Sequence, residues 1–155
     1  MVILTATVFL VIVDVLGLVS FGFFVGPFRL NHWFVLIGTL YVLFAVPAIS
    51  ILKRRHPNNA KTLLRLHMFG NLFAFALISI HFVSQISRTA EHYPNLGTGL
   101  ALYIALILLV GTGISQRFHL ILKIQPQTYR FLHTGAAVTF YLIIVIHVLH
   151  GLGIL

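Results

Sequence analysis

The chain contains no cysteine and very little acid. Without cysteine it forms no disulfide, holds no iron–sulfur cluster through thiolates and attaches no c-type haem covalently. Aspartate and glutamate together number 2, and charged residues make up 8% of the chain, whereas about a quarter of a typical soluble domain is charged. The shortage of charged residues excludes an ordinary soluble globular protein.

Apolar residues dominate what is present. They account for 59% of the 155 residues, and the mean hydropathy is +1.05. Lysine and arginine number 10, which gives a formal net charge of +8. Because these cations lie between apolar runs, membrane topology explains them and no nucleic-acid partner is expected. The composition predicts an all-α membrane protein in contact with lipid.

Five apolar runs predict five transmembrane helices. Residues 1–25 are expected to form an accessory first helix, and residues 30–155 a bundle of four helices. Pro47 is expected to kink the second of the five, and Asn59 to cap the third. The expected spans are 2–25, 33–52, 60–87, 96–115 and 128–152.

Asp14 is an acid within the first apolar run. It indicates a proton path or buried pair, or else a protonated side chain packed against a neighbouring helix or a span displaced along the membrane normal. Because the residue is isolated, we favour packing.

The cations predict the orientation in the membrane. Five spans place successive loops on alternating sides, and only Arg29 and Arg88 fall on the less basic side. The positive-inside rule then places the N-terminus inside and the C-terminus outside. We expect a multi-pass protein of a prokaryotic cytoplasmic membrane. The cations on the expected inner side are Lys53, Arg54, Arg55, Lys61, Arg65, Arg117, Lys123 and Arg130.

Four histidines form two pairs with one spacing. His67 and His81 are fourteen residues apart in the third span, and His133 and His147 repeat this spacing in the fifth. Fourteen residues advance a helix by about 21 Å and bring the side chain to within roughly 40° of the same face. Since both spans run in the same direction, His67 pairs with His133 and His81 with His147. The pattern predicts two His–metal–His sites at different depths, each suited to a b-type haem (heme b).

Glycines repeat at the same interval in the fourth span. Gly97-Thr98-Gly99 recurs as Gly111-Thr112-Gly113. Small residues there either make room for haem or permit ordinary helix packing. Gly70, Gly135, Ala136 and Ala137 lie within a turn of the inner ligands and carry the same two interpretations.

Other polar residues lie near the expected haems. Arg130 and Arg65 are candidate partners for haem propionates, as are Lys61 and Arg88. His147 is preferred to His150 as a ligand because His150 lies about 100° from the ligand face. Four residues near the outer side are candidates for a quinone pocket or proton exit, or are hydrated interfacial groups: His32, Glu91, His92 and His150.

At His67/His81 and His133/His147 the sequence resembles the two-haem membrane cytochromes of the cytochrome b type. It is similar both to the quinol-oxidising cytochrome b subunits and to the transmembrane domain of ferric reductases. The resemblance implies two parallel ligand helices separated by one helix, with glycines beside the haems. The match is incomplete, because Leu52 stands where a further glycine is expected and no proline–glutamate motif is present.

These features predict transmembrane electron transfer through two bis-histidine haems. We expect a membrane subunit of a larger oxidoreductase linked to a quinone pool, with other redox subunits as partners, rather than a complete enzyme. Two alternatives remain: a stand-alone transmembrane reductase of an extracytoplasmic acceptor, and a histidine-dependent proton or metal transporter.

Overall fold

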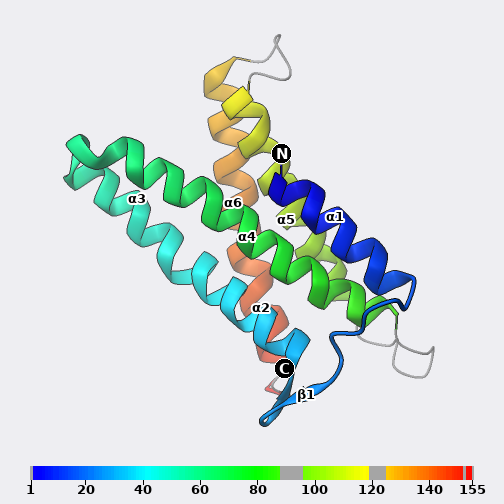
Figure 1. Ribbon diagram of the computed structural model, residues 1–155. Coiled ribbons are helices and arrows are strands. Elements are labelled where there is room, and N and C mark those ends of the chain that lie inside the picture. The colour runs from blue at the N-terminus through cyan, green and yellow to red at the C-terminus, as the bar shows by residue number, and fades with distance from the viewer. Residues whose placement is uncertain (1, 88–95, 119–124, 152, 155) are drawn as a thin grey trace. The chain divides into compact units, whose positions relative to one another are not determined.

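The computed structural model describes residues 2–87, 96–118, 125–151 and 153–154 (Figure 1). The chain divides into two compact units, residues 1–90 and residues 91–155. Unit 2 contains α5 (Leu96–Phe118) and α6 (Pro126–Gly151). The elements of unit 1 are α1 (Val2–Val15), β1 (Phe24–Val25), β2 (Phe28–Arg29), α2 (Leu30–Leu40), the π-helix η1 (Tyr41–Ala45), α3 (Val46–Arg55), the 3₁₀ turn η2 (Pro57–Asn59) and α4 (Ala60–Ile86).

The helices confirm the expected all-α membrane character. In the described part of the chain, four helical segments are long and apolar enough to cross a membrane. The segments α2–η1–α3 and η2–α4 lie in unit 1, and α5 and α6 in unit 2. The four segments are Leu30–Arg55, Pro57–Ile86, Gly97–Phe118 and Pro126–Gly151.

The first helix is shorter than the sequence suggested. We expected a span through residue 25, but α1 ends at Val15 after 14 residues. A helix of that length is about 21 Å long, against about 30 Å of hydrocarbon. The amide of Leu18 donates to the carbonyl of Val13, and Gly17 adopts a φ of +68°. This arrangement is a Schellman motif, in which glycine accepts the left-handed conformation that ends a helix. A continuous first span is therefore wrong.

The second apolar segment changes its helical pitch just before Pro47. Five residues, Tyr41–Ala45, form a π-helix, in which the amide of Val46 donates to the carbonyl of Tyr41. Proline has no amide hydrogen and disturbs the hydrogen bonds of the turn before it. The expected irregularity at Pro47 is thus a π-helical insertion within a segment that stays helical.

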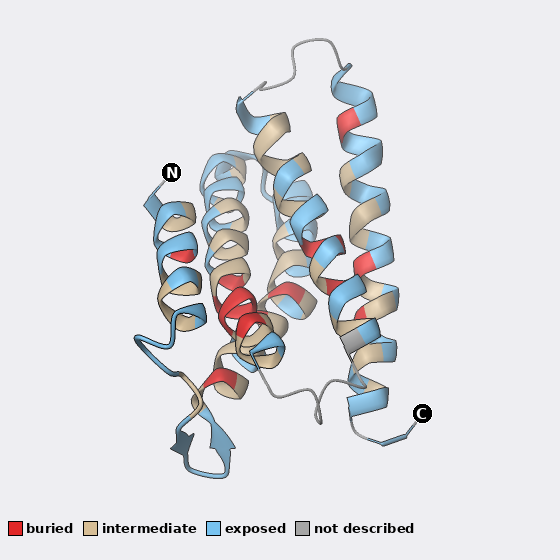
Figure 2. Ribbon diagram, turned by 90° about the vertical axis from the view of Figure 1, so that its right-hand side faces the viewer, coloured by how far each residue is buried: buried red, intermediate tan, exposed pale blue. Residues whose placement is uncertain are grey.

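Helix α4 is the central element of unit 1 and packs against α1, α2 and α3. Its buried positions concentrate in its C-terminal half, from Ala74 to Val83 (Figure 2). Gly38 of α2 allows the close approach, because an added Cβ would lie 3.1 Å from both the carbonyl oxygen of Ala74 and Cγ1 of Ile78. At the start of α4, Asn59 occupies the N-cap position but makes no capping hydrogen bond with its side chain. The expected position of the cap is confirmed, but the side chain of Asn59 does not make the capping hydrogen bond.

Gly70 accommodates the aromatic ring of Tyr41. The Tyr41 hydroxyl donates a hydrogen bond of 2.7 Å to the carbonyl of Leu66, and the ring occupies the place of a Cβ at Gly70. The room left by Gly70 is used for helix packing within unit 1. The expectation that this glycine makes room for haem is not supported.

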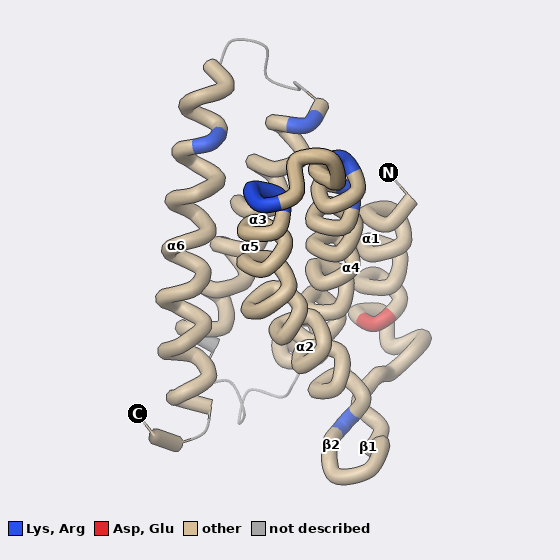
Figure 3. Tube along the Cα trace, turned by 90° about the vertical axis from the view of Figure 1, so that its left-hand side faces the viewer, with Lys and Arg blue, Asp and Glu red and all other residues tan. Residues whose placement is uncertain are grey.

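The cations of unit 1 gather at one end (Figure 3). Lys53, Arg54 and Arg55 lie in the last turn of α3, and Lys61 and Arg65 follow in the first turns of α4. Arg29, in β2, is at the opposite end of α2. In unit 2, Arg117 ends α5 and Arg130 lies near the start of α6. Arg88 and Lys123 lie outside the described residues.

Substitution of Gly70 tests the contact with Tyr41. Gly70→Ala is expected to lower the free energy of unfolding by about 1–3 kcal/mol, because the added methyl group collides with the Tyr41 ring. The measurement is the thermal unfolding midpoint in detergent. As a control, the same substitution in a Tyr41→Ala background should cost much less. An equal cost in both backgrounds would contradict the proposed packing.

Candidate functional site

Helices α5 and α6 of unit 2 bring each threonine of the repeated motif to one histidine. The hydroxyl oxygen of Thr98 lies 3.1 Å from Nδ1 of His147, and that of Thr112 lies 3.0 Å from Nδ1 of His133. Thr98 precedes Thr112 by fourteen residues in α5, but its partner His147 follows His133, the partner of Thr112, by fourteen residues in α6. The helices are therefore antiparallel, with the two repeats in register.

One glycine of each motif contacts the same imidazole. A Cβ added to Gly99 would lie 3.4 Å from Cε1 of His147, and a Cβ added to Gly113 would lie 3.4 Å from Cε1 of His133. Each histidine thus has a threonine at Nδ1 and a glycine beside Cε1. We call these arrangements the outer Thr–Gly–His unit (Thr98, Gly99, His147) and the inner Thr–Gly–His unit (Thr112, Gly113, His133).

The hydrogen bonds of Thr112 indicate which nitrogen of His133 carries a proton. The Thr112 hydroxyl donates to the backbone carbonyl of Leu108 at 2.7 Å, and it also lies 3.1 Å from the carbonyl oxygen of Leu109. With its hydrogen donated to a carbonyl, the hydroxyl can accept a hydrogen bond from His133 in the tautomer that carries its proton on Nδ1. This tautomer leaves a lone pair on Nε2, as a metal-ligating imidazole requires.

The other two predicted ligands both lie in α4, as expected. Nδ2 of Asn71 is 3.3 Å from Nε2 of His67 and 3.4 Å from Nδ1. The ring of His81 meets the ring of His32 from α2 at a centroid distance of 5.4 Å and an angle of 63°. Each of these histidines is half-buried and has a polar neighbour within unit 1.

The remaining predicted cofactor contacts have different surroundings. No described atom lies within 4 Å of a Cβ added to Gly97, Gly111 or Gly135. Residues two apart on a helix point in directions about 200° apart, so Gly97 does not share a face with Gly99. Arg65 and Arg130 are exposed. Roles for these residues in cofactor binding stay predictions.

The candidates for an outer polar pocket are only partly described. His32 contacts His81, and His150 is exposed near the end of α6. Glu91 and His92 lie outside the described residues.

Asp14 packs against α4. The hydroxyl of Ser84 donates a hydrogen bond of 3.1 Å to its carboxylate, and Asp14 is half-buried. This contact agrees with the packing interpretation that the sequence favoured, because the carboxylate has a specific partner on a neighbouring helix of unit 1.

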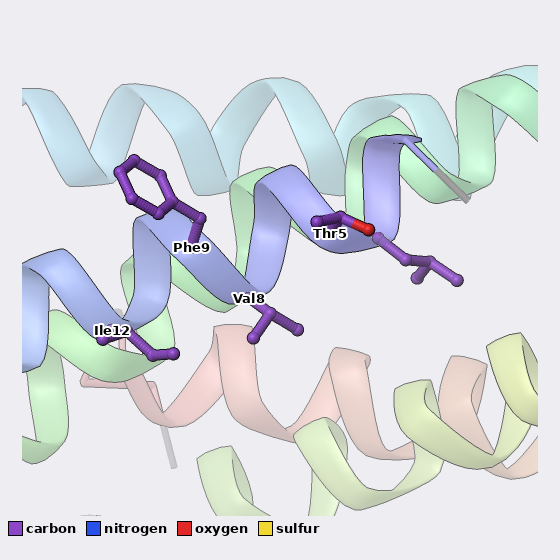
Figure 4. A pocket seen from close by; sticks show the side chains of 5 residues that line it. Thr5, Val8, Phe9 and Ile12 are labelled. Carbon is purple, nitrogen blue, oxygen red and sulfur yellow. The ribbon is translucent and has the colours of Figure 1, made fainter.

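A shallow depression on α1 offers no comparable chemistry. It is lined by Leu4, Thr5, Val8, Phe9 and Ile12, and its surface is almost entirely apolar (Figure 4). Such a surface suits lipid chains. Within the described residues, no group of three or more His, Cys, Asp or Glu side chains is arranged to hold a metal ion.

Sequence reasoning selected the glycines of the repeat and missed the threonines between them. The signal was present, because Thr98 and Thr112 share the fourteen-residue spacing of the histidines. The contacts of Asn71 with His67 and of His32 with His81 were also missed. The four-residue spacing of His67 and Asn71 along α4 could have indicated their contact. The contact of His32 with His81 could be found only from the packing of α2 against α4.

The chain was compared with protein families, curated proteins and solved structures, and no match was found in any of the three.

Replacing each threonine by valine tests the two hydrogen bonds. Thr112→Val is expected to shift the Nδ1 resonance of His133 and leave His147 unchanged, because each threonine contacts one imidazole. Thr98→Val should do the reverse. Each variant should also lose about 0.6 kcal/mol of stability, the average for such a bond between membrane helices. The readout is nitrogen NMR of histidine-labelled protein, and a shift of both imidazoles by one variant would contradict the geometry.

Proposed function

We propose that the chain is a membrane electron-transfer protein that holds two b-type haems. One haem is ligated by His67 and His133 and the other by His81 and His147. The pairing follows from the order of the histidines along α4 and α6. Because one span, α5, separates these helices in the sequence, both would cross the membrane in the same direction, so that the first histidines share one depth and the second histidines the other. The proposal makes the chain a cytochrome of the bis-histidine type.

The duplicated Thr–Gly–His unit carries the proposal. Two histidines, fourteen residues apart, have threonines at Nδ1 at 3.0 Å and 3.1 Å and glycines beside Cε1 at 3.4 Å. Hydrogen bonding at Nδ1 fixes the ring orientation and increases the basicity of Nε2, as it does for metal-bound imidazoles generally. A single buried histidine needs only one hydrogen-bond partner. That requirement does not explain why a glycine also recurs beside each imidazole.

Haem fits these residues better than a single metal ion. Each predicted level supplies two imidazoles and no carboxylate, whereas non-haem sites usually have three or four ligands. A haem iron with two axial imidazoles changes oxidation state without an open coordination position, which suits electron transfer. Gly99 and Gly113 leave space beside the imidazoles, Thr98 and Thr112 orient them, and the apolar helices exclude water.

Arginines near the ligand helices complete the proposed site. Arg65 precedes His67 by two residues, and Arg130 precedes His133 by three. Both are exposed, at the cation-rich ends of their units. Guanidinium groups form bidentate hydrogen bonds with carboxylates, so Arg130, about 60° around α6 from His133, suits a propionate of the inner haem. Arg65 points about 200° away from His67 around α4, so it is the weaker candidate.

The predicted irons would be about 21 Å apart along the helix axis. Such a pair carries electrons from one side of the membrane to the other. We propose that the chain serves as a subunit of a larger oxidoreductase, which exchanges electrons with quinone and with a redox partner. With the four long segments as spans, the positive-inside rule puts the cations of α3 and α4 on the cytoplasmic side and the C-terminus outside. The N-terminus, expected inside from five spans, then lies outside, because α1 ends at Val15 and precedes the first span.

A second candidate function is transport of protons or metal ions by histidine. The contact between His32 and His81, with centroids 5.4 Å apart, favours it because two imidazoles at that distance can share a proton or a cation. Asp14 and Ser84 add polar groups to the same end of α4. This function would require no haem.

Ligand substitution separates the two functions. The purified wild-type chain should contain two b-type haems, measured by pyridine haemochrome assay and reduced-minus-oxidised spectra. His67→Ala and His133→Ala should remove one spectral component, and His81→Ala and His147→Ala the other. His150→Ala is the matched control, because it removes an exposed histidine one turn from His147 and should retain both components. A colourless wild-type preparation would favour transport, and one haem that survives all four substitutions would contradict the ligand assignment.

The glycine contacts predict a matched pair of defects. Gly113→Leu should weaken binding of the inner haem by roughly 10-fold or more, since the added side chain displaces the His133 ring and its hydrogen bond. Gly99→Leu should do the same for the outer haem through His147. The measurement is haem retention during titration with apomyoglobin, followed separately for the two spectral components. Each variant serves as the control for the other, and equal loss of both components in either would count against the assignment.

A further inference from the structure

The segment between α1 and α2 exposes apolar side chains on backbone that is irregular from Leu16 to Phe23 and forms only a short two-stranded hairpin from Phe24 to Arg29. Phe23, Phe24 and Phe28 are 56%, 68% and 51% exposed. Irregular backbone exposed to lipid is excluded from the hydrocarbon, because its amide and carbonyl groups would lose their hydrogen bonds. Aromatic rings at this exposure are equally unfavourable in bulk water. The segment therefore suits the headgroup region, where both water and apolar contact are available.

A tight hairpin organises this segment. Val25 of β1 pairs with Phe28 of β2 across a two-residue turn of Gly26 and Pro27. Gly26 has a φ of +62°, which suits the first position of a type II′ turn. The turn therefore fixes the backbone from which the side chains of Phe24 and Phe28 extend.

Contacts with α2 fix the hairpin at the helix entrance. Nε1 of Trp33 donates a hydrogen bond of 2.8 Å to the carbonyl of Val25. The Trp33 and Phe28 rings meet edge to face, with centroids 5.5 Å apart. The amide of Leu30 also donates to the carbonyl of Phe23 at 2.9 Å. The hairpin is thus held in a set position relative to the end of a helix long enough to cross the membrane.

Arg29 adds a positive charge to the aromatic surface. Its guanidinium carbon lies 5.4 Å from the centroid of the Phe24 ring. A cation stacked on an aromatic ring and exposed at this boundary can also bind an anionic phosphate. Tryptophan and tyrosine belts with flanking cations are typical of the membrane interface.

We propose that the hairpin Phe23–Arg29 is a lipid-binding anchor, which inserts its aromatic rings among the headgroups and binds a lipid phosphate through Arg29. Its partner is the bilayer surface and not another subunit, because the surface combines scattered aromatic rings, exposed backbone and one cation. The anchor lies at the end of unit 1 opposite the cations of α3 and α4. It sets the depth of α2 and does not depend on haem binding.

Spin labelling tests the depth of the hairpin. The chain has no cysteine, so Phe24→Cys and Phe28→Cys each provide a unique labelling site in the full-length protein. The labelled proteins are placed in nanodiscs of phosphatidylcholine and phosphatidylglycerol, and collisions with oxygen and with a nickel chelate are measured. Asn58→Cys in η2 is the aqueous reference, and Leu36→Cys on an exposed position of α2 is the hydrocarbon reference.

At both hairpin sites, the ratio of oxygen to nickel collisions is expected to lie between the two reference values. A ratio equal to that of Asn58→Cys would place the hairpin in water, and one equal to that of Leu36→Cys would place it in the hydrocarbon. Low accessibility to both reagents would show that protein covers it. Any of these three results would overturn the proposal, and agreement between the two sites excludes a local effect of one substitution.

A second measurement addresses the phosphate contact. Arg29→Gln should weaken the association of spin-labelled phosphatidylglycerol with the protein by about five-fold, the effect of one cation near an anionic surface. Arg29→Lys retains the charge and should keep most of the association. Unchanged lipid association in Arg29→Gln would overturn the role of Arg29.

Discussion

Histidine side chains within apolar helices need hydrogen-bond partners, because the hydrocarbon contains no water to solvate them. In unit 2 this need is met twice by the same arrangement, with Thr98 at His147 and Thr112 at His133. A threonine hydroxyl can satisfy its own hydrogen on the preceding turn of its helix and still accept from an imidazole. For His133, whose neighbour Thr112 donates to Leu108, a proton on Nδ1 would satisfy burial and leave Nε2 available as a ligand.

Because α5 and α6 pack antiparallel, the same threonine–histidine contact can form twice along them. Fourteen residues are close to four turns, so a motif copied at this interval returns to nearly the same face of each helix. At positions 99 and 113 the imidazoles lie so near the backbone of α5 that an added Cβ would meet Cε1 at 3.4 Å, in van der Waals contact. In unit 1 the surroundings differ, because His67 lies beside Asn71 and His81 beside His32. Unequal surroundings of this kind would give two bound haems different redox potentials.

Hydropathy predicted the four long helices, since long apolar runs have few alternatives in a membrane. It failed at α1, where the single glycine at position 17 ends the helix through a local hydrogen-bond motif that hydropathy does not register. The sequence left two roles open for the glycine at position 70, and hydropathy could not choose between them because its neighbour, Tyr41, comes from another helical segment. The four histidines stand out in the sequence by their spacing, and their role as ligands stays a prediction. Spacing could also have indicated Thr98, Thr112 and Asn71, but threonine and asparagine are common in membrane helices, and only packing distinguishes those that contact a histidine.

The central claim is that each of two haem irons is bound by two histidines of this chain. Near-infrared magnetic circular dichroism of the oxidised protein tests it most directly, because the energy of the charge-transfer band depends on the pair of axial ligands. Ligation by the two histidine pairs predicts low-spin haem with bis-imidazole ligation only, at two haems per chain. High-spin haem, a different axial ligand or the absence of haem would contradict it.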